Sequence, residues 1–390
     1  MISAVPLAGR SLCLRLEFII RNITLMIIDL INWGFKALGE YLSAHVLTCL
    51  IPAFFIAGAI AVFINQSTVM KYFGAKANKW LAYTVASFSG AILAVCSCTI
   101  LPLFAGIRQR GAGLGPAISF LYSGPAVNVL AVVYSARLLG IDLGIARGIG
   151  AVAFAYIIGL LLAFIFSKEE ERLYPGDSDF NLHEEKKHPL WKITVYFAVM
   201  IVLLITASSI GLVIEIINVG GGKGELVLSG KILPTILAVF FLTATVWMSL
   251  LWYNRDERSQ WMKETGKLAW KILPILLIGV FAAGIIKALL PQSIVQKWVG
   301  GNSLGNNMLA SVFGALMYFS TLTEVPIVKA LLDLGMGKGP ALTLLLAGPS
   351  LSLPNMIVIS RIIGIKRTGV YTAAVIVMSA FTGMMFGKIF

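Results

Sequence analysis

Hydrophobic and polar residues form long alternating blocks along this chain. Apolar runs of about 20 residues, the length that crosses a bilayer as a helix, recur through the sequence between short polar stretches. Two further apolar stretches, 115–137 and 339–361, are each interrupted by a Gly-Pro pair. A weaker segment, 17–35, carries three charged residues, which also suits an amphipathic helix in the membrane interface. The clearest candidate spans are 42–65, 80–106, 143–166, 190–217, 231–252, 269–290, 308–328 and 369–388.

The pattern predicts an all-α, polytopic membrane protein with about 9–11 transmembrane segments. Composition agrees, because 58% of the 390 residues are apolar and only 13% are charged. A soluble domain could not cover that much apolar surface with polar residues. This excludes a soluble enzyme and a disordered chain, and the four cysteines are too few for a disulfide framework.

The charge balance gives a topological signal. Lys and Arg total 31 against 18 Asp and Glu, a net charge of +13. The basic residues lie in small groups between apolar runs, as in cytoplasmic loops beside anionic lipid, rather than in a nucleic-acid-binding patch. The N-terminal residues show no apolar core followed by a small-residue cleavage site, which predicts no removable signal peptide. We therefore expect a multi-pass protein of the cell inner (cytoplasmic) membrane whose partners are the lipid bilayer, a small-molecule substrate and no nucleic acid. A homo-oligomer remains open.

An internal repeat divides the chain. At a constant offset of 224 (326 − 102), Gly, Pro and Arg residues of one stretch match those of another. The matches pair Pro102 with Pro326, the G-x-G-x-G-P run 111–116 with 335–340, Gly124-Pro125 with Gly348-Pro349, Arg137 with Arg361, Gly140 with Gly364, Ser87 with Ser311, and Gly90 with Gly314. The predicted parts are an N-terminal amphipathic or first membrane helix (1–41), membrane repeat 1 (42–166), a charged loop (167–189), two linking spans with a charged loop (190–268) and membrane repeat 2 (269–390).

The two Gly-Pro pairs predict broken or re-entrant helices. Proline removes a backbone donor and clashes with the preceding turn, and the residue before it avoids the α conformation. Broken backbone persists in hydrocarbon only where it is buried in protein or lines a wet cavity. A helix starting just after each proline would point its N-terminal amides into the break. The paired breaks thus predict a substrate or ion site, with a purely structural kink as the alternative.

The orientation of the two halves follows from how these segments cross. If each broken segment crosses the membrane, the halves are predicted to be parallel; if each dips in and returns, they are inverted. The basic residues flanking both sides of each segment do not decide between these topologies. Short broken segments paired between halves favour the inverted arrangement.

Cys96 and Cys98 are the first candidates for binding chemistry. On an ideal helix they point roughly 200° apart, so they could meet one ligand only if the helix unwinds near Pro102. Thiolates favour soft ions and thiophilic metalloids, although a buried cysteine is often a small apolar filler. The matching positions of the second repeat are Ser320 and Leu322, so a thiol site would be asymmetric.

Glu324 is the candidate for proton coupling. It is the only carboxylate in the membrane-depth segments of either repeat, and it aligns with Ile100. A buried acid is costly unless it is paired or protonated, so such residues are functional by default. The alternative is a helix-end glutamate that pairs with Lys329 near water.

Amides and hydroxyls accompany both breaks. Asn128 follows Gly124-Pro125 by one turn, and Asn355 follows the second break. They could line a polar route or satisfy freed backbone groups. The hydroxyl residues of the same stretches are Ser119, Tyr122, Ser123, Ser350 and Ser352. No phosphate loop, G-x-S-x-G or H-E-x-x-H motif occurs, and the histidines form no metal-ligand set, so we expect no enzyme, cofactor or resident metal.

Residues 96–128, CSCTILPLFAGIRQRGAGLGPAISFLYSGPAVN, and 320–355, STLTEVPIVKALLDLGMGKGPALTLLLAGPSLSLPN, resemble the predicted permeases of the ArsP-like family. The resemblance spans nearly the whole chain and implies a polytopic permease. Relatives that export trivalent organoarsenicals such as methylarsenite imply that Cys96 and Cys98 are candidate ligands for a thiophilic arsenic species.

The resulting hypothesis is a secondary-active permease, with efflux of a metalloid or organoarsenical driven by proton exchange at Glu324. The expected substrate site comprises Cys96, Cys98, Ser123, Gly124, Pro125, Asn128, Gly348, Pro349, Ser350 and Asn355. One alternative is a permease for an anion or small sulfur compound recognised by helix N-termini with Arg108, Arg110 or Arg361. Another is an intramembrane thiol redox protein using the two cysteines, and a third is an uncoupled channel.

Overall fold

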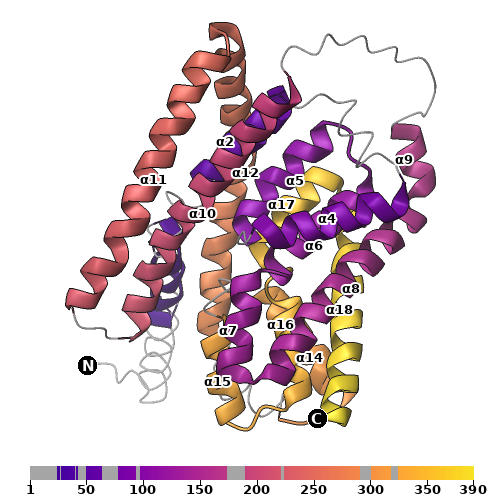
Figure 1. The fold of residues 1–390 in the computed structure, drawn as a ribbon. Coiled ribbons are helices and arrows are strands. Elements are labelled where there is room, and N and C mark those ends of the chain that lie inside the picture. Colours follow the sequence, from indigo (N-terminus) through magenta and orange to yellow (C-terminus); the bar gives the residue numbers. More distant parts are fainter. Residues whose placement is uncertain are drawn as a thin grey trace, which may run out of the picture.

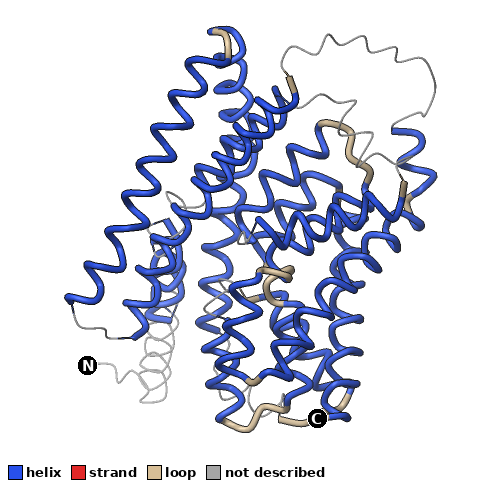
Figure 2. The backbone as a smooth tube through the Cα atoms, viewed as in Figure 1, coloured by secondary structure: helices blue, strands red, loops and turns tan. Residues whose placement is uncertain are grey.

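The described part of the chain is helical, with no strand (Figure 2). The computed structural model describes residues 24–26, 28–39, 41–42, 50–63, 78–93, 97–173, 189–220, 224–289, 300–317 and 324–390. This confirms the all-α fold. The helices in chain order are α2 (Ile51–Phe63), α4 (Lys79–Leu93), α5 (Ser97–Gln109), α6 (Leu114–Ala126), α7 (Val129–Leu139), α8 (Ile141–Ile165), α9 (Ser167–Leu173), α10 (Leu190–Gly220), α11 (Gly224–Trp252), α12 (Arg255–Leu289), α14 (Leu304–Leu316), α15 (Glu324–Asp333), α16 (Lys338–Ala347), α17 (Leu353–Ile363) and α18 (Ile365–Ile389).

Several of these helices suit a bilayer. Among the described residues, four helices are long and apolar enough to cross one: α8, α18 and the stretches Thr235–Trp252 and Arg255–Ile285. The bent pair Leu114–Ala126 and Ala131–Leu139, which meet at 44°, makes a fifth if the two helices are counted as one span. Large apolar side chains on α11, such as Trp247, are exposed on the protein surface, as a lipid-facing helix requires. The chain is therefore a multi-pass membrane protein; the expected segment 17–35 lies partly outside the described residues.

Helix bounds in the two halves match at the offset of 224. Adding 224 to the bounds of α7 and α8 gives those of α17 and α18 without remainder. The start of α6 maps onto the start of α16, and the end of α5 onto the end of α15. The four glycines with positive φ in the described part also pair in this way, Gly111 with Gly335 and Gly140 with Gly364. Their left-handed backbone, which favours glycine, makes the same turns in each half.

Interhelical contacts match as well. Ser119 Oγ of α6 donates to the Ala155 carbonyl oxygen of α8 at 2.7 Å. The counterpart in the second half is Thr343 Oγ1 of α16, which donates to the Ser379 carbonyl oxygen of α18 at 3.1 Å. A Cβ added at Gly159 would overlap Ser119 Oγ. Small residues thus let α6 lie close against α8, the usual means of tight helix packing in membranes.

The matching helices run in opposite directions. Asp142, at the start of α8, pairs with Lys338 at 3.2 Å, and the Lys338 ammonium lies 5.9 Å from the ring of Phe390, just after α18. Arg367, near the start of α18, instead pairs with Glu170 of α9, just after α8, at 3.2 Å. The start of each long helix therefore lies beside the end of the other (Figure 1). We call these the Asp142 end and the Glu170 end of the bundle.

The helix pair α14–α15 enters and leaves the bundle at its Asp142 end. Asn302, just before α14, donates to the Met384 carbonyl oxygen near the Asp142 end. Farther along α14, Gly314 approaches Gly348, and α15 begins at Glu324, which also abuts Gly348. From there α15 runs back to the Asp142 end, where α16 begins.

The pair α4 and α5 makes the same excursion from the opposite end. Tyr83 Oη of α4 donates to the Gly159 carbonyl oxygen, close to the end of α8. At the end of α5, Arg108 pairs with Glu170 at 3.0 Å. We refer to α4–α5 and α14–α15 as the first and second hairpins.

The expected spans 80–106 and 308–328 are therefore wrong as single crossings. Hydropathy measures how many apolar residues a stretch contains and carries no sign of a reversal within it. The Gly-Pro segments run from one end of the bundle to the other. The expected link between crossing segments and parallel halves is wrong too. A hairpin enters and leaves at the same end and so adds no crossing. The number of crossings between the start of one half and the start of the other is then odd, and the halves are inverted.

Candidate functional site

Both Gly-Pro pairs lie at the ends of helices deep in the bundle. In the first half α6 ends at Ala126 and α7 begins at Val129; in the second, α16 ends at Ala347 and α17 begins at Leu353. The next helix thus starts four residues after each proline (129 − 125 and 353 − 349). The expectation that it starts just after the proline is wrong, since each Gly-Pro pair lies at the end of the preceding helix and further residues, 127–128 in the first half and 350–352 in the second, separate it from the next helix.

Two tyrosines bind the backbone freed at the second break. Tyr122 Oη of α6 donates to the Leu346 carbonyl oxygen of α16 at 3.0 Å. Tyr371 Oη of α18 donates to the Ser350 carbonyl oxygen at 3.3 Å. Both tyrosines are fully buried. The two breaks therefore lie side by side, and a side chain of the first half holds the backbone of the second.

A buried ion pair lies beside this contact. Arg147 Nη2 of α8 lies 3.3 Å from Glu324 Oε2 of α15, and both side chains have no exposed surface. Arg147 Nη1 donates to Ser135 Oγ of α7 at 2.9 Å. Removing one partner of a buried pair costs about 3–5 kcal/mol, because the other charge is left uncompensated. The pair therefore joins the first half to the second hairpin through a bond that is costly to break.

The hydrogen bonding of this pair is incomplete. Glu324 Oε1 and Arg147 Nε are buried and have no hydrogen-bond partner among the described residues. Gly348 lies against Glu324 Oε1, where a Cβ would overlap it. Tyr122 interacts electrostatically with both members of the pair. A proton or another polar group could therefore complete the site without displacing a protein hydrogen bond.

The predicted polar residues divide into two groups. Ser123 Oγ donates to the Ala86 and Phe120 carbonyl oxygens, both at 3.2 Å, so its hydroxyl serves helix packing. Asn128 is buried in the first break, and Ser350 and Asn355 are buried at the second. Asn355 Oδ1 has no hydrogen-bond partner in the described part of the chain. Gly124 and Pro125 are buried in the last turn of α6, and Gly348 and Pro349 in the turn after α16.

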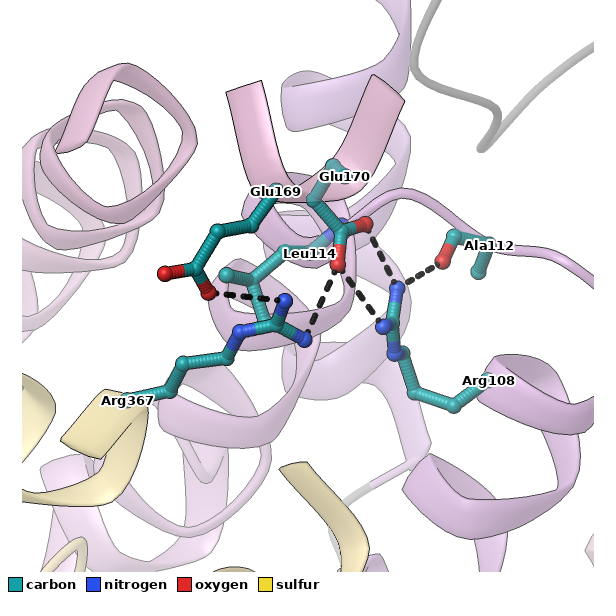
Figure 3. Close-up of polar contacts among 6 residues, drawn as sticks. All are labelled: Arg108, Ala112, Leu114, Glu169, Glu170 and Arg367. Atoms are coloured by element: carbon teal, nitrogen blue, oxygen red, sulfur yellow. Dashed lines mark hydrogen bonds and ion pairs between the residues drawn. The ribbon is translucent and has the colours of Figure 1, made fainter. Parts of the chain in front are cut away.

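The arginines expected to recognise an anion lie elsewhere. Arg108 is held at the Glu170 end, with Nη1 and Nη2 each 3.0 Å from a Glu170 carboxylate oxygen (Figure 3). Glu170 also accepts the Leu114 backbone N–H at 3.1 Å and pairs with Arg367. Arg361 is exposed. The start of the expected charged loop 167–189 is therefore a structural tie between the first hairpin, α6 and α18.

The opposite end is held more weakly. Lys338 and Asp142 are 45% and 42% exposed, whereas the side chains of Arg108 and Glu170 are 9% and 7% exposed. Exposed ion pairs contribute about 0–1 kcal/mol and are screened by salt.

The alternative partner for Glu324 is also excluded, because Lys329 pairs with Asp333 on the surface at 2.7 Å.

Comparison with known proteins shows the family of this chain. A family model described as predicted permease, ArsP_1, matches residues 33–388. The chain belongs to this permease family. It is 42% identical over 365 residues to UPF0718 protein MJ0584 of Methanocaldococcus jannaschii, covering 93% of this chain and 97% of that protein. It is 22% identical over 315 residues to UPF0718 protein YraQ of Escherichia coli, covering 78% and 70%. No solved structure matches.

The cysteines are the part of the expected site that this structure leaves undescribed. Cys96 lies outside the described residues, and Cys98 is the second residue of α5, described by its backbone alone. Within the described part of this permease, no group of three or more His, Cys, Asp or Glu side chains could hold a metal ion. Ligation by the thiols stays a prediction.

Arg147 is the functional candidate that the sequence interpretation missed. It lies within the predicted span 143–166, where a charged side chain is itself a sign of function. Considering arginines in the spans as well as carboxylates would have found it. Its partner could not have been named from sequence, because 177 residues separate it from Glu324.

Proposed function

We propose that this protein is a secondary-active permease of the cell inner membrane that exports a thiophilic metalloid or organoarsenical. The permease family supports transport through the membrane. The resemblance of residues 96–128 and 320–355 to arsenical exporters supports the cargo. In this proposal Cys96 and Cys98 contact the cargo near the paired breaks, and no cofactor takes part.

The buried Glu324 is the observation that carries proton coupling. It lies where the second hairpin meets α8 of the first half. Moving the hairpin relative to α8 separates Arg147 from Glu324, which leaves a buried carboxylate unpaired and is unfavourable. Separating the ionised pair leaves two buried charges without partners, whereas separation after Glu324 is protonated leaves only the charge on Arg147. Protonation therefore lowers the cost of hairpin movement, and the movement can carry the proton from one side to the other.

Transport into inverted vesicles tests this mechanism. We expect methylarsenite uptake to increase with a proton gradient, and Glu324→Gln to abolish that increase. Asp333→Asn is the matched control, because Asp333 lies on the same helix with its side chain 59% exposed. Gradient-independent uptake by the wild type would overturn coupling, and unchanged uptake by the Cys96→Ser, Cys98→Ser variant would overturn the thiol contact.

Arg147 favours a second candidate function, a permease for an anion or small sulfur compound. A buried guanidinium recognises carboxylate, phosphate and similar groups with paired donors. Uptake of thiosulfate and methylarsenite by the same vesicles would separate the two cargoes.

A further inference from the structure

We propose that Arg147 is a binding residue for a small anion, and that the Glu324 carboxylate occupies the place of that anion in this structure. The inference rests on the proposed permease function and assigns a substrate class to its site. It starts from the charges at the pair. With Glu324 ionised the site is neutral; with Glu324 protonated it carries one uncompensated positive charge, fully buried on Arg147.

Neighbouring groups offer no second negative charge. In the described part of the chain, Glu324 is the only carboxylate that forms an ion pair with Arg147. The other groups at the guanidinium, Ser135 and Tyr122, are neutral hydroxyls. A buried charge without a partner is strongly unfavourable, so protonation of Glu324 creates a vacancy that a small anion can fill.

The charged side chains on packed helices are occupied or distant from the pair. On α15 itself Lys329 pairs with Asp333, and on α16 Lys338 pairs with Asp142. On α7, Arg137 is exposed, and Tyr134 is 37% exposed. On α18, Tyr371 donates to a backbone carbonyl. None of these groups supplies the missing negative charge.

Donors at the site are suited to an anion. Arg147 Nε is buried without a partner, and release of Glu324 would expose Nη2 as well. Protonated Glu324 becomes a donor. One proton on Glu324 and one anion on Arg147 leave the net charge at zero, so the two would move together.

Anion binding to the purified full-length protein tests the inference. Glu324→Gln mimics the protonated acid, and thermal unfolding is followed in nitrate or thiosulfate against gluconate at equal ionic strength, since a ligand of the folded state raises Tm. We expect half-maximal stabilisation of Glu324→Gln at about tenfold lower nitrate than for the wild type at pH 8, because the competing carboxylate is gone. Lowering the pH should bring the wild type toward the variant.

Two further variants make the result decisive. Arg147→Gln with Glu324→Gln leaves no buried charge and should lose the nitrate effect, whereas Arg137→Gln with Glu324→Gln should retain it. Equal stabilisation of both double variants would overturn the inference. Proton-driven methylarsenite transport without specific nitrate or thiosulfate binding would overturn the anion site alone, whereas Arg147-dependent binding without transport would overturn the proposed function alone.

Discussion

Arg147 and Tyr371 occupy the same place in the two halves, since 147 + 224 = 371, yet they do different work. Tyr371 donates to the backbone of the break in its own half. Arg147 pairs with an acid of the opposite half. The same helix position thus carries a hydrogen-bond donor to the backbone in the second half and a charge that pairs with the opposite half in the first. A duplicated scaffold can keep its packing and still concentrate titratable chemistry in one place.

Removing the positive charge of the buried ion pair should have the largest effect on stability. Arg147→Gln leaves Glu324 buried without its partner, and we expect the free energy of unfolding to fall by about 3–5 kcal/mol. Denaturant unfolding of the purified protein in detergent measures this. Arg147→Gln with Glu324→Gln should recover most of the loss, and a double variant as unstable as the single one would contradict the assignment.

Crowding the acid should have an intermediate effect. Gly348→Ala places a methyl group against Glu324 Oε1, and overpacking of this kind costs about 1–3 kcal/mol. The pH dependence of transport should shift with it. Gly124→Ala is the matched variant, because the position equivalent to Glu324 is Ile100 (324 − 224), and there the pH profile should stay unchanged. Equal shifts in both variants would contradict a role for the acid.

Removing the backbone contact should have the smallest effect. Tyr371→Phe deletes the hydrogen bond to the Ser350 carbonyl oxygen, and we expect a loss of about 0.5–1.5 kcal/mol. Transport should keep the pH profile of the wild type, as proton-driven flux at several pH values would show. A changed pH profile would mean that Tyr371 also influences the protonation that drives transport.

Sequence patterns predicted much of the fold because glycine and proline mark backbone geometry directly. The turn glycines Gly140 and Gly364 have positive φ in both halves, and the helix ends follow the two Gly-Pro pairs closely. The hairpins could not be predicted from hydropathy, since a helix pair that turns back within the bundle can contain the same apolar residues as one helix that runs its full length.

The candidate site was predicted on one side only. Glu324 stood out as a carboxylate at membrane depth, and its side chain is fully buried in the structure. Arg147 lies 177 residues from it in the sequence, and only tertiary packing brings the guanidinium to the acid. Arg108, an expected anion-recognition residue, belongs instead to the network around Glu170.

The hydrogen bond from Tyr122 to Leu346 joins residues that are counterparts of one another, because 122 + 224 = 346. Counterparts touch only where the local symmetry axis passes, so this contact marks the pivot about which the two halves are related. Movement of one break relative to the other would stretch or break this hydrogen bond. Such a bond contributes about 0.5–1.5 kcal/mol, so it adds a small cost to any rearrangement that separates the two centres.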